Sequence, residues 1–198
     1  MNLEAKFRDA LERTSRALER LGEPWMLIGA IPVAAWGRAR ATTDIDFQTH
    51  LEVHRADALD LELRKEEFER TDGPLTIPQK PLALVKYWLG ARPNAAGIGI
   101  DLFFVTGAWQ TEGLSRRIAV TFGDRPYWVA TPEDLLLYKL LAAREHDLND
   151  IAGILERRYD SMDWGYVRLA ASRIGLGLPS FLERILDQFR KEFGKEPG

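Results

Sequence analysis

The sequence predicts an α+β fold, in which a twisted mixed β-sheet is flanked by helices and followed by a small helical C-terminal region. Segments of helical period and short apolar strand-like segments both occur along the 198 residues, and the strand-like ones lie in the first two thirds. A chain of this length can bury one substantial core. We expect residues 1–130 to form one domain and residues 131–198 to form a helical region that packs on it, or the two to form one continuous domain.

The first third of the chain alternates between helical and strand-like patterns. Leu3, Phe7, Leu11 and Leu18 recur at helical spacing, and the apolar run 25–28 stops at Gly29. Pro32 suits the first turn of a following helix, and Gly37 suits its end. The expected elements are therefore a helix over 3–21, a strand over 25–29, a helix over 30–36, an acidic strand from 44 and a helix over 53–65.

The middle of the chain is β-rich, and the end is helical. Gly, Pro and Asn turns separate the apolar runs. At Thr131, a threonine followed by Pro132 and two acidic residues is typical of a helix start, with Thr131 as N-cap. The expected strands are 68–70, 82–89, 98–106, 118–122 and 127–129, and helices follow from 132, over 161–174 and over 179–193.

Two aspartates one residue apart are the clearest chemical signal. Asp44 and Asp46 flank Ile45 on a predicted strand, so both carboxylates project from one face. Asp101 lies in a second apolar run, 98–105, where an unpaired buried charge would cost several kcal/mol. If the two strands are neighbours, the three carboxylates converge. Hard oxygen ligands of this kind suit Mg²⁺ or Mn²⁺, which bind substrate phosphates.

A strand, a small-residue turn and a helix N-terminus precede this acidic strand. The free N–H groups and the positive end of the helix dipole would favour a triphosphate, and small residues at Gly29 and Ala30 would let it approach. Arg38 and Arg40 add positive charge, and Thr43 leads into the acidic strand. The ordinary alternatives are solvated arginines or salt bridges to the aspartates.

Composition restricts the classes of protein that the chain can represent. It has 27 Lys and Arg, 30 Asp and Glu and a formal net charge of -3, which disfavours broad non-specific nucleic-acid binding but allows a local basic patch that grips an RNA end. The absence of cysteine excludes thiolate metal sites and leaves carboxylates as the metal ligands. No apolar stretch approaches the ~20 residues of a membrane span, so we expect no membrane association and a cytoplasmic protein.

These motifs resemble the nucleotidyltransferase superfamily with the DNA polymerase β-like fold. Its signature is a hydrophobic residue, Gly, then Gly or Ser, a spacer, and Asp-hydrophobic-Asp/Glu-hydrophobic. Here it reads Ile28-Gly29-Ala30, a thirteen-residue spacer, and Asp44-Ile45-Asp46-Phe47, with Asp101 matching the third carboxylate. Ala30 departs from the pattern. The runs GRARATTDID and TPEDLLLYKLLAAREHDLNDI give a closer likeness to small bacterial proteins related to the abortive-infection (AbiEii-type) nucleotidyltransferase toxins, over roughly residues 20 to 155.

The resemblance implies that residues 1–130 form a nucleotidyltransferase catalytic domain. It implies transfer of a nucleoside monophosphate from a nucleoside triphosphate to an acceptor, with two Mg²⁺ or Mn²⁺ ions. It assigns Asp44 and Asp46 to both metals, and Asp101 to the metal at the attacking oxygen and to the acceptor's proton. It assigns Gly29 and Ala30 to the triphosphate. Lys139 matches a lysine that contacts nucleotide phosphates. The nucleotide-binding residues expected are thus Gly29, Ala30, Arg38, Thr43 and Lys139.

The segment that follows Lys139 is polar. We expect Asp147 to cap the next helix and Asp150 to pair with Lys139. A surface lysine is the ordinary alternative for Lys139.

Three classes of function remain open on the sequence. The first is an enzyme that adds nucleotides to RNA in a toxin–antitoxin setting, beside a cognate antitoxin protein. The second is an enzyme that modifies a small molecule, such as an aminoglycoside, or a protein. The third is a catalytically silent nucleotide-binding or antitoxin component, which the alanine at position 30 favours and the three intact carboxylates disfavour.

Overall fold

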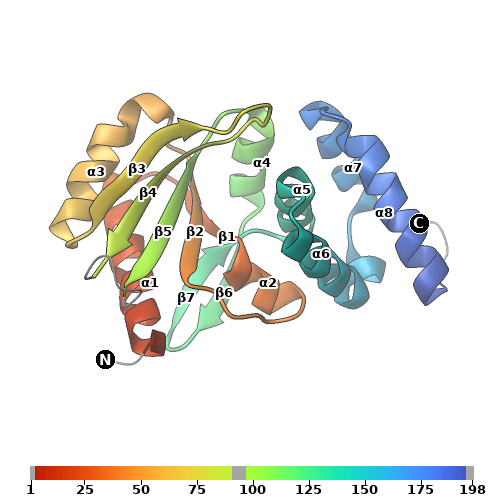
Figure 1. The fold of residues 1–198 in the computed structure, drawn as a ribbon, viewed down its shortest axis with the longest axis horizontal. Coiled ribbons are helices and arrows are strands. Elements are labelled where there is room, and N and C mark those ends of the chain that lie inside the picture. The colour runs from red at the N-terminus through yellow and green to blue at the C-terminus, as the bar shows by residue number, and fades with distance from the viewer. Residues whose placement is uncertain (1–2, 91–96, 195–198) are drawn as a thin grey trace.

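A seven-stranded mixed sheet organises the computed structural model, which describes residues 3–90 and 97–194 (Figure 1). The strand order is β3-β4-β5-β2-β1-β7-β6. Neighbouring strands are antiparallel except at β2–β5 and β1–β7, which are parallel. The strands are β1 (Trp25–Ile28), β2 (Asp44–Thr49), β3 (Glu69–Thr76), β4 (Ala83–Leu89), β5 (Ile98–Phe104), β6 (Ile118–Phe122) and β7 (Arg125–Val129).

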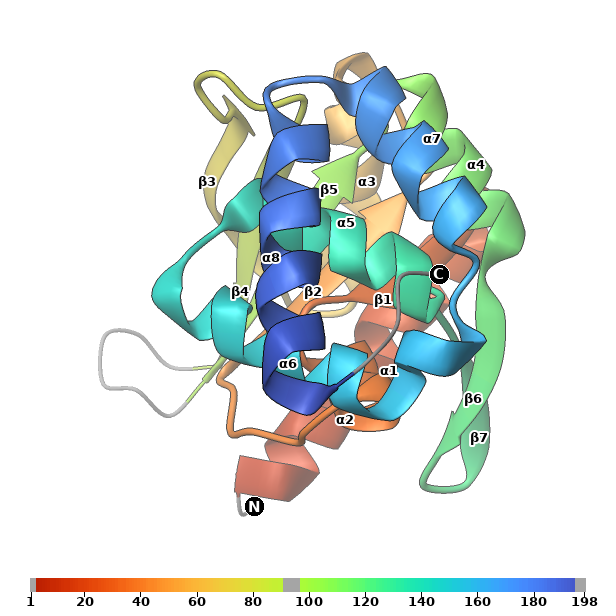
Figure 2. The same cartoon turned by 90° about the vertical axis from the view of Figure 1, so that its right-hand side faces the viewer.

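Helices cover both faces of this sheet. Figure 2 shows the C-terminal helices in front of it, whereas α1 and α3 pack against the opposite face. The helices are α1 (Leu3–Leu21), α2 (Ala30–Trp36), α3 (Ala56–Lys65), α4 (Ala108–Arg116), α5 (Pro132–Ala142), α6 (Glu145–Arg158), α7 (Trp164–Ile174) and α8 (Leu178–Phe193), with 3-10 turns η1 (Val53–Arg55) and η2 (Tyr159–Ser161).

The alternation of side chains along β2 divides the core into two parts. Ile45 and Phe47 are fully buried on the face covered by α1 and α3. Asp44, Asp46 and Gln48 alternate with them and therefore project from the other face. That second face packs against α5 and the helices that follow, so the acidic residues lie beneath the helical C-terminal part of the chain.

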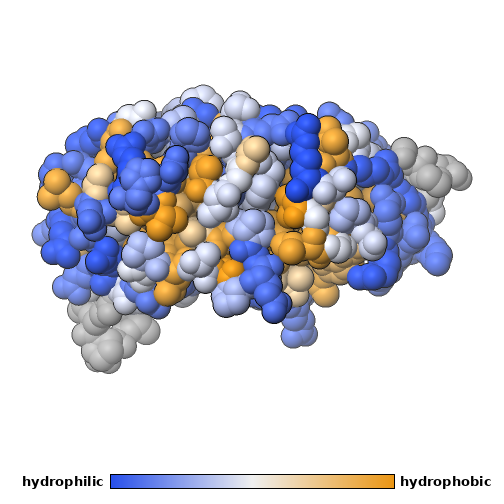
Figure 3. Space-filling view, turned by 90° about the horizontal axis from the view of Figure 1, so that it is seen from above, coloured by the Kyte–Doolittle hydropathy of each residue, from blue (hydrophilic) through white to orange (hydrophobic). Residues whose placement is uncertain are grey.

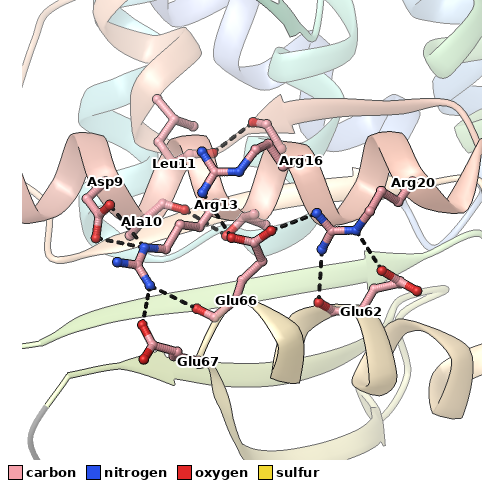
Figure 4. Close-up of polar contacts among 11 residues, drawn as sticks. Asp9, Ala10, Leu11, Arg13, Arg16, Arg20, Glu62, Glu66 and Glu67 are labelled. Atoms are coloured by element: carbon pink, nitrogen blue, oxygen red, sulfur yellow. Dashed lines mark hydrogen bonds and ion pairs between the residues drawn. The ribbon is translucent and has the colours of Figure 1, made fainter.

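An ion-pair network joins α1 to α3 (Figure 4). Arg20 binds Glu62 and Glu66, each at 2.7 Å, and Arg16 binds Glu66 at 2.9 Å. Arg13 binds Glu67 at 2.6 Å. A single exposed pair contributes little to stability, but Arg16 and Arg20 share the Glu66 carboxylate, and the network holds the two helices side by side over the sheet.

Most elements lie where the sequence predicts them. The bounds of α1, α2 and β6 match, and Thr131 caps α5 by accepting a hydrogen bond from the Asp134 N–H at 3.2 Å. Several expectations differ from the structure. The strand expected over 68–70 is β3, which extends from 69 to 76, the helix expected over 161–174 begins at 164, and residues 108–116 form α4, which the sequence does not predict. Arg144, not Asp147, is the N-cap of α6, and Asp147 at the third helical position accepts a hydrogen bond from the Arg144 N–H at 3.1 Å. In the part of the chain that the structure describes, no helix has both the length and the apolar character that crossing a bilayer requires.

Candidate active site

One residue from each of four adjacent strands forms a row across the centre of the sheet. Asp46 on β2 is in register with Asp101 on the parallel strand β5 and with Ile28 on β1. Lys86 on β4 is the register partner of Asp101 and donates a hydrogen bond to its Oδ2 at 2.6 Å. Side chains in register share one face, so this row places a cation and two carboxylates side by side.

Asp44 adds a third carboxylate to this face. It begins β2, two residues before Asp46, and its register partner on β5 is Gly99. A Cβ at Gly99 would lie 2.3 Å from Oδ1 of Asp44. A side chain at position 99 would therefore displace the Asp44 carboxylate, and glycine keeps the space between Asp44 and Asp101 open.

Gly29 likewise leaves space for a carboxylate, here that of Asp46. It joins β1 to α2 with φ of 72° and ψ of -140°, a conformation that L side chains rarely adopt. A Cβ here would lie 1.9 Å from Oδ2 of Asp46. The glycine turn that the sequence predicts as a phosphate site therefore touches the acidic site directly.

A compact ion network from α5 and α6 lies next to the aspartates. Lys139 is 3% exposed and donates to Asp147 at 3.0 Å and to Asp150 at 2.7 Å. The predicted Lys139–Asp150 pair is thus confirmed. Arg144 binds Asp147 at 2.7 Å, and Arg40 binds Asp150 at 3.0 Å. A small hollow contains Gly29, Asp46, Lys139 and Arg144 in its lining, so cations and carboxylate face the same space.

The environment of Asp46 disfavours its charged form. Burial, followed by the negative charge of Asp101, raises the pKa of Asp46 to about 7, against the opposing charge of Lys139. Burial likewise raises the pKa of Asp101, although Lys86 opposes this shift. Within the described residues, no Lys, Arg or His lies within 4 Å of Asp44 or Asp46. Among the described residues, Asp44 and Asp46 therefore have no cation at ion-pair distance that would compensate their negative charge.

A buried polar network supports the floor of the hollow. The hydroxyl of Tyr138 donates to Oε1 of Gln48 at 2.8 Å. Gln48 is fully buried and donates to the carbonyls of Thr49 and Phe103 at 2.9 and 3.2 Å. Gln48 follows Asp46 by two residues, so these bonds tie the acidic strand to α5 and to β5.

Comparison of the whole chain with known proteins bears on its fold. No family model and no curated protein sequence matches. Among solved structures, an antigenic nucleotidyltransferase-like protein from Paracoccidioides brasiliensis superposes with a TM-score of 0.53 at 16% identity, over 91% of this chain and 86% of that one. The chain has a nucleotidyltransferase-like fold. ANT(2'')-Ia in complex with adenylyl-2''-tobramycin is also similar, with a TM-score of 0.48 and 12% identity over 93% of this chain and 97% of that one.

The donor set of this nucleotidyltransferase-like fold suits a divalent cation. Carboxylate oxygens are the ligands that Mg²⁺ and Mn²⁺ prefer, and Asp44, Asp46 and Asp101 share one face of the sheet. Within residues 3–90 and 97–194, no three His, Cys, Asp or Glu side chains already form a cluster of metal-binding geometry. Carboxylates repel one another, and Asp101 is held by Lys86. The three carboxylates therefore have the chemistry that the cation needs, but they do not converge as closely as the sequence analysis expects.

The other predicted nucleotide-binding residues are dispersed. Ala30 is buried at the start of α2, and Thr43 is exposed, with its carbonyl accepting the Gly99 N–H at 3.2 Å. Arg38 binds Glu156 on α6 at 2.5 Å and lies outside the hollow. Sequence reasoning missed Lys86, Arg144, Gln48 and Tyr138. Lys86 and Gln48 carried a signal, since each is a polar residue at an alternate position of an apolar strand, whereas nothing in the sequence marked Arg144.

Proposed function

We propose that the protein is a metal-dependent nucleotidyltransferase, which transfers a nucleoside monophosphate from a nucleoside triphosphate to an acceptor and releases pyrophosphate. The observation that carries this proposal is the in-register pair of Asp46 and Asp101, with Asp44 on the same face and the cations Lys139 and Arg144 beside them. Such a site combines ligands for a cation with groups that attract phosphate.

The carboxylates have separate roles in this proposal. Asp44 and Asp46 would hold two Mg²⁺ or Mn²⁺ ions, and Asp101 would share one of them. When bound, these ions would neutralise phosphate charge and stabilise the attacking and leaving oxygens of an in-line displacement. The raised pKa of Asp46 supports the assignment, because an ionised carboxylate buried beside a second one needs positive charge nearby, which a bound cation would supply.

Residues around the hollow would hold the triphosphate. Gly29 has no side chain to block the approach of a phosphate to the backbone, and Ala30 follows it at the start of α2. Lys139 and Arg144 would attract the negative charge. We also include Thr43 and Arg38, from the segment between α2 and β2, as nucleotide-binding residues, with Arg38 exchanging Glu156 for a phosphate.

Asp101 is suited to receive the proton of the acceptor. In the reaction, the acceptor oxygen forms a bond to the α-phosphorus, the bond from that phosphorus to the bridging oxygen breaks, and pyrophosphate leaves. Burial raises the pKa of Asp101, which makes it a stronger base than an exposed aspartate. Lys86 donates to the same carboxylate at 2.6 Å and would fix its orientation.

RNA is the first acceptor that we propose, in a toxin–antitoxin setting with a cognate antitoxin as protein partner. This choice rests on the resemblance of the sequence to abortive-infection toxins. A small molecule such as an aminoglycoside, or a protein, is the alternative acceptor; ANT(2'')-Ia, by the description of its structure, carries an adenylylated tobramycin.

The test is transfer of label from each α-labelled nucleoside triphosphate, with Mg²⁺ or Mn²⁺, to total RNA, to aminoglycosides or to the protein itself. Asp46→Asn and Asp101→Asn should each lower the rate at least a hundredfold. Asp124→Asn is the matched control, because Asp124 is exposed in the β6–β7 turn and its substitution makes the same chemical change.

Transfer by the native chain and by Asp124→Asn, together with its loss in the two site variants, would support the enzyme and identify its acceptor. No transfer to any acceptor, combined with no metal-dependent nucleotide binding, would overturn the proposal in favour of a catalytically silent component.

A further inference from the structure

A second cavity, of about 520 Å³, lies at the C-terminal end of α5. It is open to solvent and is lined by the turn between β3 and β4, by the end of α5, and by the connection from α7 to α8 with the start of α8. The β3–β4 and α7–α8 connections lie at the top of the molecule in Figures 1 and 2. Figure 3 looks onto this side, where apolar surface emerges between hydrophilic side chains. Its size is typical of a pocket for a small organic ligand.

The backbone around this cavity is strained. Four non-glycine residues of the described chain have positive φ, and three of them line the cavity, namely Gln79 at 60°, Ala143 at 52° and Leu176 at 56°. Glycine would be the least strained residue at each position. Residues held in such conformations cluster at binding sites, because their side chains serve a purpose that offsets the strain. Three loops that are far apart in the sequence therefore each contribute a residue of strained backbone conformation to the wall of the same cavity.

The charges that line the cavity are positive. Lys80 and Arg184 contribute to its wall, and no Asp or Glu of the described chain does. Among the described residues, no carboxylate lies within 4 Å of either cation; Lys80 donates instead to the Ala142 carbonyl at 2.9 Å. Arg184 lies over the Phe181 ring, 5.6 Å from its centroid. The cavity thus offers two available cations to an anion.

The remaining wall is apolar. It includes Leu140, Leu141, Leu178, Leu176 and Phe181. Phe181 is half-buried, and Leu176 is 61% exposed, so both present open surface to a ligand. A flat ring could stack on Phe181 and Leu176 while a phosphate reaches Lys80 and Arg184. This combination of a ring surface with neighbouring cations matches a nucleotide and disfavours a polycationic sugar.

The cavity adjoins the acidic site through α5. Tyr138, Lys139 and Ala142 line the hollow of Asp46, whereas Leu140, Leu141 and Ala143 line this cavity. The two spaces therefore lie on opposite sides of the same helical turn. The Lys80–Ala142 hydrogen bond lies between them. A molecule held in the cavity would therefore be separated from the hollow of Asp46 by one turn of α5.

We propose that this cavity binds the acceptor, and that the acceptor is a nucleotide whose base stacks on Phe181 and whose phosphate binds Lys80 and Arg184. This inference rests on the function proposed above and specifies its substrate class. The same chemistry is present in a free nucleoside monophosphate and in the terminal nucleotide of an RNA strand, and the experiment separates these two sources.

The test measures binding of a fluorescent 12-nucleotide single-stranded RNA by polarisation, without divalent metal, in competition with adenosine monophosphate, adenosine and kanamycin. We expect the double variant Lys80→Gln/Arg184→Gln to weaken RNA binding at least tenfold. Arg157→Gln/Lys191→Gln is the matched control, because both residues are exposed and neither lines the cavity.

The outcomes discriminate between the possibilities. Competition by the monophosphate at concentrations close to those of RNA indicates a free nucleotide, and RNA binding that the monophosphate displaces only weakly indicates the strand end. Equal weakening by both double variants, adenosine binding as well as its monophosphate, or tighter binding of kanamycin would each overturn the inference.

A transfer assay separates this inference from the proposed function. If RNA binding depends on Lys80 and Arg184 but no transfer occurs, the cavity assignment stands and the proposed nucleotidyltransferase activity is wrong. If transfer occurs and the acceptor KM is unchanged in Lys80→Gln/Arg184→Gln, the proposed activity stands and the cavity assignment is wrong.

Discussion

Asp46 and Asp101 occupy the same register position on two adjacent parallel strands, so their carboxylates share one surface of the sheet. Neither strand can move its aspartate to the other face without a one-residue slip, which would also turn Ile45 and Leu102 out of the core. The core thus enforces the closeness of two like charges, and several properties of the protein should follow from it.

The stability of the metal-free protein should depend on the protonation of Asp46. Its pKa is about 7 in the folded protein and ordinary, near 4, in the unfolded chain, so the folded state retains a proton that the unfolded state loses between these values. The free energy of unfolding should therefore fall as the pH rises from about 4 to about 7. Asp46→Asn should be more stable than the native protein at pH 8 and similar at pH 4, as measured by urea denaturation with EDTA present. Parallel pH profiles of the two proteins would contradict this expectation.

Divalent cations should stabilise the native protein at pH 8. A ligand that binds only the folded state at a hundred times its Kd adds about 2.7 kcal/mol to the free energy of unfolding. We expect Mg²⁺ or Mn²⁺ to raise the Tm of the native protein and of Asp124→Asn, and to have little effect on Asp44→Asn or Asp46→Asn. A calorimetric scan with and without the ion measures this. Equal shifts in all four proteins would show that the ion binds elsewhere.

Gly29→Ala should damage the site more than an equivalent change outside it. The new Cβ would lie 1.9 Å from Oδ2 of Asp46, so the carboxylate must move. Gly175→Ala is the matched control, because Gly175 has nearly the same backbone angles, φ of 72° and ψ of -133°, and no atom within 4 Å of the added Cβ. Gly175→Ala should cost about 1–3 kcal/mol through backbone strain alone, and Gly29→Ala about 1–3 kcal/mol more through the clash. Urea denaturation of both variants checks the difference.

Lys139→Met should destabilise the protein even without nucleotide. Lys139 is the buried cation between Asp147 and Asp150, and its removal leaves each aspartate with one arginine. Breaking a buried pair typically costs about 3–5 kcal/mol, and we expect the lower end here because Arg40 and Arg144 remain. Lys191→Met, on the exposed surface of α8, should change the free energy of unfolding by less than about 0.5 kcal/mol. Equal stability of the two variants would argue against a structural role for the pair.

Leu176→Gly should stabilise the fold and weaken nucleotide binding at the same time. Leu176 has φ of 56° and is 61% exposed, so glycine relieves strain of about 1 kcal/mol and loses little buried surface. Leu176→Ala keeps the strain and removes the side chain, so it should weaken RNA binding without a rise in Tm. Unchanged RNA affinity in both variants would remove Leu176 from the proposed acceptor cavity.

The sequence was informative wherever a local period or turn decides the structure. The Asp-x-Asp spacing fixed two carboxylates on one face, and Thr131 and Pro132 marked the start of α5 correctly. The helix α4 was missed because its apolar residues, Trp109 and Leu114, are few and lie among polar ones. Its burial comes from contacts with residues that are distant in the chain, which no local pattern reports.

The surroundings of the aspartates were harder to predict for the same reason. The pairing of β2 with β5, which places Asp101 beside Asp46, spans more than fifty residues of chain. Lys86 and Arg144 reach the site from a further strand and from the start of α6. Arg38, by contrast, is close to Asp44 in sequence and binds Glu156, because the loop after α2 runs along α6.

The division of charge between the sheet and the C-terminal helices bears on how the molecule assembles. Asp44, Asp46 and Asp101 come from strands, whereas Lys139 and Arg144 come from α5 and the residue that precedes α6. During synthesis the three aspartates leave the ribosome before Lys139 and Arg144, and among the described residues Lys86 is the cation that pairs with one of them, Asp101. Attraction between the acidic strands and the later cations should therefore guide the docking of α5 and α6, and high salt should slow this step of folding.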